Sequence, residues 1–257
     1  MDKRAVAEVF GRAAEHYDGA AHLQRRVADQ LLAQVSELPL RQAGHVVDLG
    51  TGTGYCLPTL NQRFQPTLLT ALDLAEPMLA LARERVERLN LVQADLENPP
   101  LADNSVDLAV SSLAVQWLDR PEAFIARLAK ALKPGGYLAL STLGPETLRE
   151  LRQAWAQVDQ EVHVNRFMPA SDWQAALAAS PLTLTLWQAE QLEVRYDAPL
   201  ALVRELKTLG AHHVERQRTP MVGHLRPMLR AYEEFVCADG RYPATWDVFY
   251  LIARKPL

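Results

Sequence analysis

The chain has 257 residues, of which 49% are hydrophobic and 23% are charged, so it can bury the core of an ordinary α/β domain. Its formal net charge of -4 argues against a general nucleic-acid binder, although local basic surfaces are compatible with that total. Two cysteines, Cys56 and Cys237, are too few for a disulfide framework or a zinc site, and no apolar run has the length of a membrane span. Together with a charged start of the chain that is unlike a signal peptide, these features predict a cytoplasmic protein with no nucleic-acid or membrane partner.

Residues 1–40 are predicted to form two helices. Apolar residues recur at helical spacing over 6–10 and again over 23–35, with a break near 17–19. An arginine, a histidine and a tyrosine occur close to that break, where the first helix is expected to end. The segment is either a solvated helix end or a lid over a binding site.

Residues 46–54, VVDLGTGTG, are the most informative stretch. A β-branched apolar run followed by an acid and alternating glycines is typical of a buried strand that ends in a tight loop. Glycine allows positive φ and leaves the backbone open to a ligand. The GxGxG spacing differs from the GxGxxG of dinucleotide folds, in which a helix N-terminus receives a pyrophosphate, and so disfavours a nicotinamide-dependent oxidoreductase. A purely structural turn is the alternative.

Two further acids occur where strands are expected to end. Asp73 closes the second predicted strand, where a carboxylate can accept hydrogen bonds from both hydroxyls of a ribose. Met78 follows in the next helix, where it either fills the core or contacts an adenine. Residues 90–96 read as a short strand that ends in Asp95 and Leu96, an acceptor for an exocyclic amine next to an apolar cover for the ring.

The alternation of strands and helices continues to Leu143 and then changes. Strands are predicted at 105–113 and 133–140, which indicates βαβ units and a mostly parallel sheet. Beyond Leu143 we expect a helix at 145–158, a helix from a capping box at Ser171 to Leu177, a sixth strand in two pieces at 182–186 and 192–196, a helix at 199–209 and a last strand from Thr245. We therefore expect one domain over residues 1–257, with a lid at 1–40, a core at 44–143, cap insertions at 144–170 and 197–242 and the final strand at 244–255.

Four features follow one another in a fixed order: the loop DLGTGTG, the strand-ending Asp73, the sequence QADL at 93–96 and the turn KPGG before the fifth strand. Together they resemble the class I S-adenosylmethionine-dependent methyltransferases over about residues 44–142 and the final strand. The resemblance implies an α/β, Rossmann-like fold whose seven-stranded sheet is mostly parallel with an antiparallel last strand, and a helical cap. It also implies S-adenosylmethionine as methyl donor, without a metal.

The same resemblance implies a cofactor site. The methionine moiety would contact the glycine loop, the ribose would contact Asp73, and the adenine amine would contact Asp95. The full set of cofactor-binding residues that it implies is Tyr17, Asp48, Gly50, Thr51, Gly52, Asp73, Leu74, Met78, Asp95, Leu96 and Ser111.

The flanking segments resemble one family within this class, the malonyl-acyl-carrier-protein O-methyltransferases of biotin synthesis. The resemblance lies in FGRAAEHYDGAAHLQRRVA near the start, SSLAVQW after the fourth strand, STLGPETLRELRQAW after the fifth, and in HVNRFMP and LKTLGAHH. It implies methylation of the free carboxyl group of a malonyl thioester on acyl carrier protein. This chain has Ser112 where that family usually has asparagine.

A carboxylate substrate determines what the remaining residues must do. Because a carboxylate is already ionised at neutral pH, we expect no general base and instead a group that positions an anion. An arginine fork suits that task, and Arg12 is the first candidate. The other candidates for substrate positioning are Tyr17, Gln116, Trp117, His163 and Arg166, each of which could instead be structural.

A basic stretch between residues 204 and 230 contrasts with the acidic balance of the whole chain. It is either a solvated helix face or a docking surface for an acidic carrier protein, for which the candidates are Arg204, Lys207, Arg216 and Arg218.

Three other functions of the whole chain remain open on the sequence alone. They are methylation of a quinone ring carbon, methylation of a small polycarboxylate such as trans-aconitate, and a non-catalytic S-adenosylmethionine-binding module. Carbon methylation would need a base such as His163.

Overall fold

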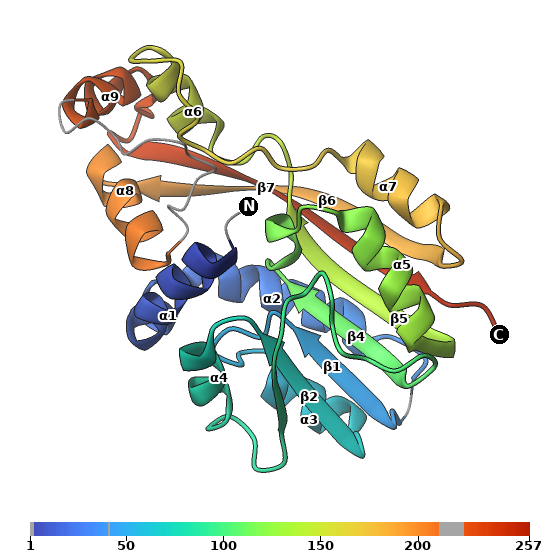
Figure 1. Ribbon diagram of the computed structural model, residues 1–257. Helices are drawn as coiled ribbons and strands as arrows, with labels where there is room; N and C mark the ends of the chain where they lie inside the picture. Colours follow the sequence, from blue (N-terminus) through green and yellow to red (C-terminus); the bar gives the residue numbers. More distant parts are fainter. Residues whose placement is uncertain (1–2, 41, 211–223) are drawn as a thin grey trace.

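The computed structural model describes residues 3–40, 42–210 and 224–257. One sheet runs through them in the order β3-β2-β1-β4-β5-β7-β6 (Figure 1). Its strands are β1 (His45–Leu49), β2 (Leu68–Asp73), β3 (Asn90–Gln93), β4 (Val106–Ser112), β5 (Leu132–Leu143), β6 (Thr183–Tyr196) and β7 (Tyr242–Arg254). Neighbouring strands from β3 to β5 are parallel, whereas β7 is antiparallel to both β5 and β6. The predicted mostly parallel, seven-stranded sheet with an antiparallel last strand is confirmed.

Strand β1 lies at the point where the strand order reverses. Val46, Val47 and Leu49 are fully buried, because helices cover both faces of the sheet here. Leu49 pairs with Leu72 at the end of β2, and Asp48 pairs with Val110 of β4, so the carboxyl ends of the three strands meet at one edge. In open α/β sheets this edge is where ligands bind.

Helices cover the sheet in two layers with separate cores. Residues of α2, α3 and α4 belong to the core on one face, and residues of α5 and α7 belong to the core on the other. The helices are α1 (Lys3–Ala20), α2 (His22–Ser36), α3 (Leu57–Phe64), α4 (Glu76–Ala82), α5 (Pro121–Ala131), α6 (Arg149–Ala156), α7 (Ala170–Ala178), α8 (Pro199–Thr208) and α9 (Leu225–Tyr232), with 3-10 turns η1 (Val115–Trp117) and η2 (Glu233–Phe235). Among the described residues no helix combines the length and apolarity that a membrane crossing requires.

Helices α6, α8 and α9 form a cap at one end of the long β6–β7 pair (Figure 1). Helix α1 lies between this cap and the core, because it packs on α8 and on α4. At Gly210, directly after α8, an added Cβ would come within 3.0 Å of Val9 Cγ1, and at Gly11 it would come within 3.3 Å of Pro77. Close contacts on both sides hold α1 over the sheet edge.

The break between the first two helices is at Ala21, not at the predicted 17–19. Helix α1 continues because Asp18 has tertiary partners. Its carboxylate accepts a 2.7 Å hydrogen bond from Thr53 Oγ1 and forms an ion pair with Arg85. These contacts stabilise the helical conformation of the last residues of α1, which the local apolar periodicity does not predict.

Three predictions for the second half need correction. Helix α6 begins at Arg149 rather than near 145, because Leu148 at its N-cap has φ 55 and interrupts the helical backbone. The predicted capping box at Ser171 is absent, since α7 begins one residue earlier and the Ser171 hydroxyl donates to Asp172. The two predicted pieces of the sixth strand are one continuous strand, because β7 pairs along its whole length.

Candidate active site

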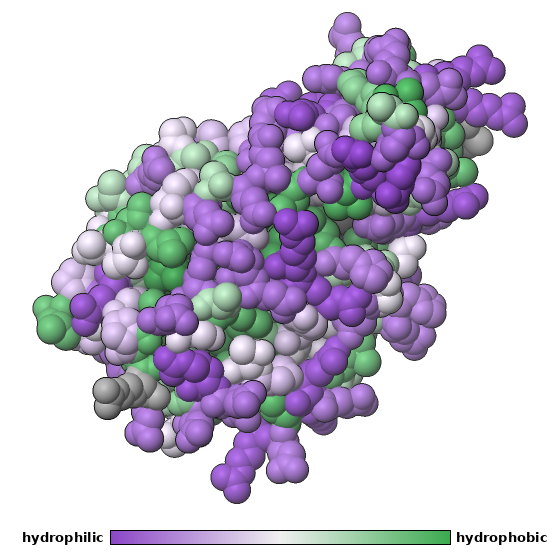
Figure 2. Space-filling view, turned by 180° about the vertical axis from the view of Figure 1, so that it is seen from behind, coloured by the Kyte–Doolittle hydropathy of each residue, from purple (hydrophilic) through white to green (hydrophobic). Residues whose placement is uncertain are grey.

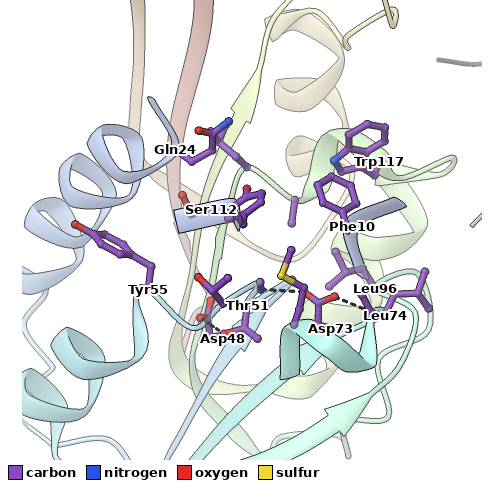
Figure 3. Close-up of a pocket in the computed structure, with 18 of the residues that line it drawn as sticks. Phe10, Gln24, Asp48, Thr51, Tyr55, Asp73, Leu74, Leu96, Ser112 and Trp117 are labelled. Carbon is purple, nitrogen blue, oxygen red and sulfur yellow. Dashed lines mark hydrogen bonds between the residues drawn. The ribbon is translucent and has the colours of Figure 1, made fainter. Parts of the chain in front are cut away.

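A pocket opens at the carboxyl ends of β1, β2 and β4, at the edge where the strand order reverses (Figure 3). Its floor is the glycine loop, the end of β2 and the start of α4. One wall contains residues 95–96 and the segment that follows β4, and α1 and α2 supply the roof. The predicted core site and the predicted N-terminal lid therefore meet in one cavity.

The glycines of the loop have different tasks. Gly50 has φ 68, and a Cβ there would lie 2.4 Å from the Ala114 Cβ, so the packing of the loop against η1 requires glycine. Gly52 has φ 54, and a Cβ there would meet nothing within 4 Å. The backbone at Gly52 is thus open to a ligand.

Asp48 lies beneath the loop and is 2% exposed. Its Oδ2 accepts a 2.6 Å hydrogen bond from Thr51 Oγ1. Burial raises the pKa of Asp48 to about 7; the bond from Thr51 opposes that rise, and the charge of Asp73 adds to it. A cation bound in the pocket would favour the ionised form of this carboxyl group.

Asp73 is oriented by the backbone. Its Oδ2 accepts from the Gly52 N–H at 2.8 Å, and its Oδ1 accepts from the Ala75 N–H at 2.9 Å. Burial raises the pKa of Asp73, and these backbone donors oppose the rise. Since a carboxylate oxygen can accept more than one hydrogen bond, both oxygens can still accept from a pair of vicinal hydroxyls.

The wall beyond Asp73 is apolar. Leu74 and Leu96 line it, and Met78 below them is 1% exposed. Phe10 of α1 packs edge-on against Trp117, with the ring centroids 5.5 Å apart, so the lid and the exit of β4 close this side (Figure 3). A flat, apolar base fits between such side chains.

Asp95 stands at the rim of the apolar wall and is held by a residue that sequence reasoning missed. Lys3 Nζ lies 2.6 Å from Asp95 Oδ2 and 2.6 Å from Glu97 Oε2. These contacts fasten the start of α1 to the segment after β3. No local sequence signal identifies Lys3, because only the fold brings it near residues about ninety positions away.

Tyr17 lines the pocket from the end of α1. Burial, with the charges of Asp73 and Asp18, raises the pKa of Tyr17 far above its usual range, so its phenol stays protonated. Helix α1 is therefore held over the pocket at both ends, by Lys3 at its start and by Asp18 at its end.

Several candidates from the sequence lie outside the pocket lining. Arg12 is exposed, because the face of α1 that carries Phe10, Ala14 and Tyr17 points inward and position 12 is on the other side. Arg166 is exposed as well. The structure brings neither guanidinium to the predicted cofactor residues.

Gln116 and Ser111 are occupied by structural hydrogen bonds. The Gln116 Nε2 donates to the Leu113 carbonyl at 2.6 Å, and the fully buried Ser111 hydroxyl donates to the Leu49 carbonyl at 2.7 Å. The neighbouring Ser112 lines the pocket instead. A one-residue difference in a strand turns the side chain to the opposite face, and the sequence alone does not settle that register.

His163 belongs to the cap. Its Nε2 lies 2.7 Å from Asp159 Oδ1, and its ring stacks on Trp155 with centroids 3.6 Å apart. His224 Nδ1 lies 3.0 Å from the other oxygen of Asp159, which links the start of α9 to the segment after α6. This cluster does not line the pocket that contains Asp73.

The basic stretch lies partly within the described residues. Arg204 and Lys207 are exposed on α8, while Arg216 and Arg218 lie outside the described residues. Seen from behind, the lobe that carries α6, α8 and α9 is mostly hydrophilic (Figure 2). In the part of the chain that the structure describes, no group of three or more His, Cys, Asp or Glu residues could hold a metal ion.

Three residues of α2 also line the pocket, Gln24, Arg25 and Ala28. Gln24 and Arg25 follow the buried Leu23. Tyr55, directly after the glycine loop, lies on the same side of the pocket as Gln24 (Figure 3). Neither Gln24 nor Arg25 is among the candidates from the sequence, because only the packing of α2 on the core brings them to the pocket.

Comparison with known proteins agrees with this geometry. Residues 47–140 match the family model of the methyltransferase domain. The chain is 39% identical to the malonyl-[acyl-carrier protein] O-methyltransferase of Laribacter hongkongensis, over 99% of this chain and 90% of that protein. The protein of that name from Serratia marcescens is 38% identical over 97% of this chain and 95% of that protein. The chain belongs to the malonyl-[acyl-carrier protein] O-methyltransferase family.

Other relatives of this O-methyltransferase differ in length or only share its fold. The biotin biosynthesis bifunctional protein BioHC of Teredinibacter turnerae is 39% identical over 99% of this chain, which spans 47% of that protein. The YcgJ protein of Bacillus subtilis superposes with a TM-score of 0.65 at 16% identity, covering 89% of this chain and 99% of that one. The geranyl diphosphate C-methyltransferase of Streptomyces coelicolor, solved with S-adenosyl-L-homocysteine, gives a TM-score of 0.52 at 16% identity, covering 89% and 74%. These structures show that the fold of this O-methyltransferase is the class I methyltransferase fold.

Proposed function

We propose that this chain transfers a methyl group from S-adenosylmethionine to the free carboxylate of a malonyl thioester on acyl carrier protein, an early step of biotin synthesis. The observation that carries the proposal is the near-complete match, in both directions, to relatives named for that reaction. Both cysteines are free thiols, which is consistent with a reaction in the cytoplasm.

The residues of the pocket fit S-adenosylmethionine. Asp73 would present both carboxylate oxygens to a ribose, and the open backbone at Gly52 would allow close approach. Leu74, Met78 and Leu96 would contact the adenine ring, and Asp48 would ionise near its positive charge. When bound, S-adenosylmethionine supplies a methyl group activated by the positive charge on its sulfur.

The substrate carboxylate is ionised at neutral pH, so the chain has no proton to remove from it. The task of its side chains is to hold that carboxylate in line and to keep water out. Favourable orientation can lower the barrier by about 7–11 kcal/mol. Phe10, Tyr17 and Trp117 form an aromatic cover over the pocket, and charge neutralisation during transfer favours such a dry site.

The carrier protein would dock beside α1. Arg204 and Lys207 are exposed on α8, and α8 packs on the helix that covers the pocket. Positive side chains there suit an acidic partner, because complementary charge steers the encounter. Arg216 and Arg218 continue the same stretch of sequence.

The test is incubation of the chain with methyl-labelled S-adenosylmethionine and malonyl-loaded carrier protein. We expect the label to appear on the carrier as a base-labile methyl ester, and an acetyl-loaded carrier, which has no free carboxylate, is the matched control. Label on a quinone or on trans-aconitate, or cofactor binding without transfer to any of these acceptors, would contradict the proposal.

A further inference from the structure

Five of the described residues that line the pocket have a hydroxyl group, and most of these groups are already engaged. Three of them donate to carboxylates at distances of 2.6 to 2.9 Å: Thr51 to Asp48, Thr53 to Asp18 and Tyr55 to Asp29. The fourth, the phenol of Tyr17, is near the charges of Asp73 and Asp18. The fifth is Ser112, at the end of β4, whose hydroxyl has one hydrogen-bond partner in the described part of the chain, and that partner is another hydroxyl.

The surroundings of that partner, Ser141 of β5, determine the direction of the bond. The two Oγ atoms are 3.1 Å apart, and either hydroxyl could donate across this distance. Ser141 is fully buried, and its Oγ accepts from the Leu113 N–H at 3.2 Å. The hydrogen of a buried hydroxyl needs an acceptor, and among the described residues Ser112 Oγ is the acceptor within reach. Ser141 therefore donates to Ser112, and the hydrogen of Ser112 is left for a group in the pocket.

The backbone that follows Ser112 is bent sharply. Leu113 has φ 48, in the left-handed region that a leucine rarely adopts. Its N–H also donates to the Ser141 carbonyl at 3.1 Å, and its carbonyl accepts from Gln116 Nε2 at 2.6 Å. The residues beyond the bend, Ala114 and Trp117, line the same pocket. A strained residue that several bonds hold in place is typical of a functional position, so we expect the end of β4 to meet a ligand.

The charges of the pocket indicate which group of a ligand Ser112 meets. Asp48 and Asp73 lie at the floor, where they favour the positive part of a ligand and repel an anion. Figure 3 shows Ser112 above these two acids, with the rings of Phe10 and Trp117 to one side. An anionic methyl acceptor is thus expected on the Ser112 side, where a hydroxyl donor suits a carboxylate oxygen.

We propose that the Ser112 hydroxyl binds one oxygen of the substrate carboxylate and that Ser141 is the positioning residue that orients it. A single neutral donor holds one carboxylate oxygen and leaves the lone pairs of the other oxygen free. That second oxygen forms a bond to the methyl carbon while the bond from this carbon to sulfur breaks, and the electron pair of the broken bond stays on the sulfur. The inference rests on the proposed function, because the carboxylate is that of the malonyl thioester.

Binding of two carriers to the full chain saturated with S-adenosylhomocysteine tests this role without methyl transfer. Malonyl-loaded carrier has the carboxylate, and acetyl-loaded carrier lacks it. For Ser112→Ala we expect about 10- to 100-fold weaker binding of the malonyl carrier in calorimetry. Binding of the acetyl carrier and of S-adenosylhomocysteine should be unchanged. Ser141→Ala should show the same selectivity with a smaller loss, because the Ser112 hydroxyl remains but is no longer oriented.

A pair of substitutions of equal size tests the direction of the bond. In Ser112→Asn the amide oxygen can accept from Ser141 while the NH2 group donates to the ligand, so we expect it to retain most of the affinity for the malonyl carrier. In Ser112→Asp the ionised side chain has no donor and repels the carboxylate. We expect it to bind the malonyl carrier at least as weakly as Ser112→Ala does.

Ser105→Ala is the matched control, because Ser105 directly precedes β4 and its hydroxyl donates to the Ala102 carbonyl at 2.6 Å. We expect it to bind all three ligands as the unsubstituted chain does. Thermal unfolding of the ligand-free variants shows that each is folded.

Unchanged binding of the malonyl carrier by Ser112→Ala would overturn the inference. Equal weakening of both carriers, or weaker binding of S-adenosylhomocysteine, would also overturn it, because Ser112 would then act through the fold or on the cofactor. If Ser112→Ala weakens the malonyl carrier selectively but the unsubstituted chain transfers no methyl group to it, the proposed function fails and the role of Ser112 in carboxylate binding stands. If methyl transfer occurs but Ser112→Ala binds both carriers normally, the proposed function stands and this inference fails.

Discussion

The parallel part of the sheet and its antiparallel end build their sites in different ways. In the part of the sheet from β3 to β5, backbone groups orient the side chains of the pocket. The N–H groups of Gly52 and Ala75, for example, donate to the carboxylate of Asp73. At the β7–β6 end, side chains from distant segments bind one another. The Thr245 hydroxyl donates to the buried Glu150 carboxylate, and two histidines contact Asp159. An arrangement that backbone groups orient follows from the fold. An arrangement of side chains that contact one another depends on the residue type at each position.

The solved structures of similar fold agree with that difference. They share the fold of this chain at 16% to 20% identity. The relatives that share its flanks and cap are 38% to 39% identical over nearly the whole chain. The distant structures thus share the fold of this chain, whereas the relatives named malonyl-[acyl-carrier protein] O-methyltransferase match it over nearly its whole length.

Asp73→Asn should have the largest effect on cofactor binding. Replacing one carboxylate oxygen by an NH2 group sets a donor against the N–H of Gly52 or Ala75, so the side chain loses its fixed orientation. We expect about 100-fold weaker binding of S-adenosylhomocysteine, measured by calorimetry. The control is Asp103→Asn, an exposed position in the loop before β4. Binding as tight as that of the unsubstituted chain would show that backbone placement of Asp73 does not determine cofactor binding.

Asp48 gives a second, smaller effect with a defined pH dependence. Because the pKa of Asp48 is about 7 in the folded chain, its ionised fraction rises between pH 6 and 8, and a cationic ligand prefers the ionised form. We expect the affinity for S-adenosylmethionine to increase about five- to tenfold over that range. Asp48→Asn should remove the increase and bind about tenfold more weakly at pH 8.

The same variant should be more stable without ligand. The folded chain holds the Asp48 proton more tightly than the unfolded chain, so stability falls as pH rises from about 4 to 7 and stays low above that. Asp48→Asn removes this loss, and we expect a higher Tm at pH 8, by about 2–4 °C for each kcal/mol recovered. An unchanged Tm would show that the buried charge costs little.

Reversal of the charges on α8 tests the proposed docking surface for the carrier protein. Arg204→Glu with Lys207→Glu should raise the KM for malonyl-loaded carrier protein about five- to tenfold at low salt, and the difference should shrink as salt is added. A small malonyl thioester should be methylated as before. If both substrates suffered equally, the docking surface would be elsewhere.

Lys3→Met should have the smallest effect. The ion pairs of Lys3 with Asp95 and Glu97 are partly exposed, and such pairs contribute about 1 kcal/mol or less. We expect a two- to fivefold change in the KM for S-adenosylmethionine and a small change in kcat, measured by steady-state kinetics. A loss as large as that of Asp73→Asn would make α1 a part of the cofactor site rather than its cover.

The sequence predicted the strands from β1 to β5 and the residues at their ends, because alternating burial and glycine placement are local signals. Pro58 and Pro77 lie in the first turns of α3 and α4, where the missing N–H of proline is tolerated. The predictions from the sequence were wrong where contacts between distant segments determine the structure. The end of α1 is extended by Asp18, and Arg12 is turned away from the pocket by the helical period. Lys3 and Arg25 reach the pocket only through the packing of α1 and α2 on the core.

Two sets of predictions remain. They are the roles of the pocket residues toward the cofactor and the division of the chain into lid, core and cap.

Ser111 illustrates why the lining of the pocket could not be predicted from the sequence alone. Its neighbour Ser112 has the same side chain, and only the register of β4 shows which of the two hydroxyls faces the pocket.

We infer that the pocket methylates an already ionised carboxylate without a general base. The most direct test is kcat for methyl transfer to malonyl-loaded carrier protein between pH 6 and 9, with both substrates saturating. We predict a flat profile, because the malonyl carboxylate is ionised throughout and titration of Asp48 affects cofactor binding rather than the saturated rate. A kcat that rises with pH through a group near neutrality would contradict the account, because it would show that a base takes part in the transfer.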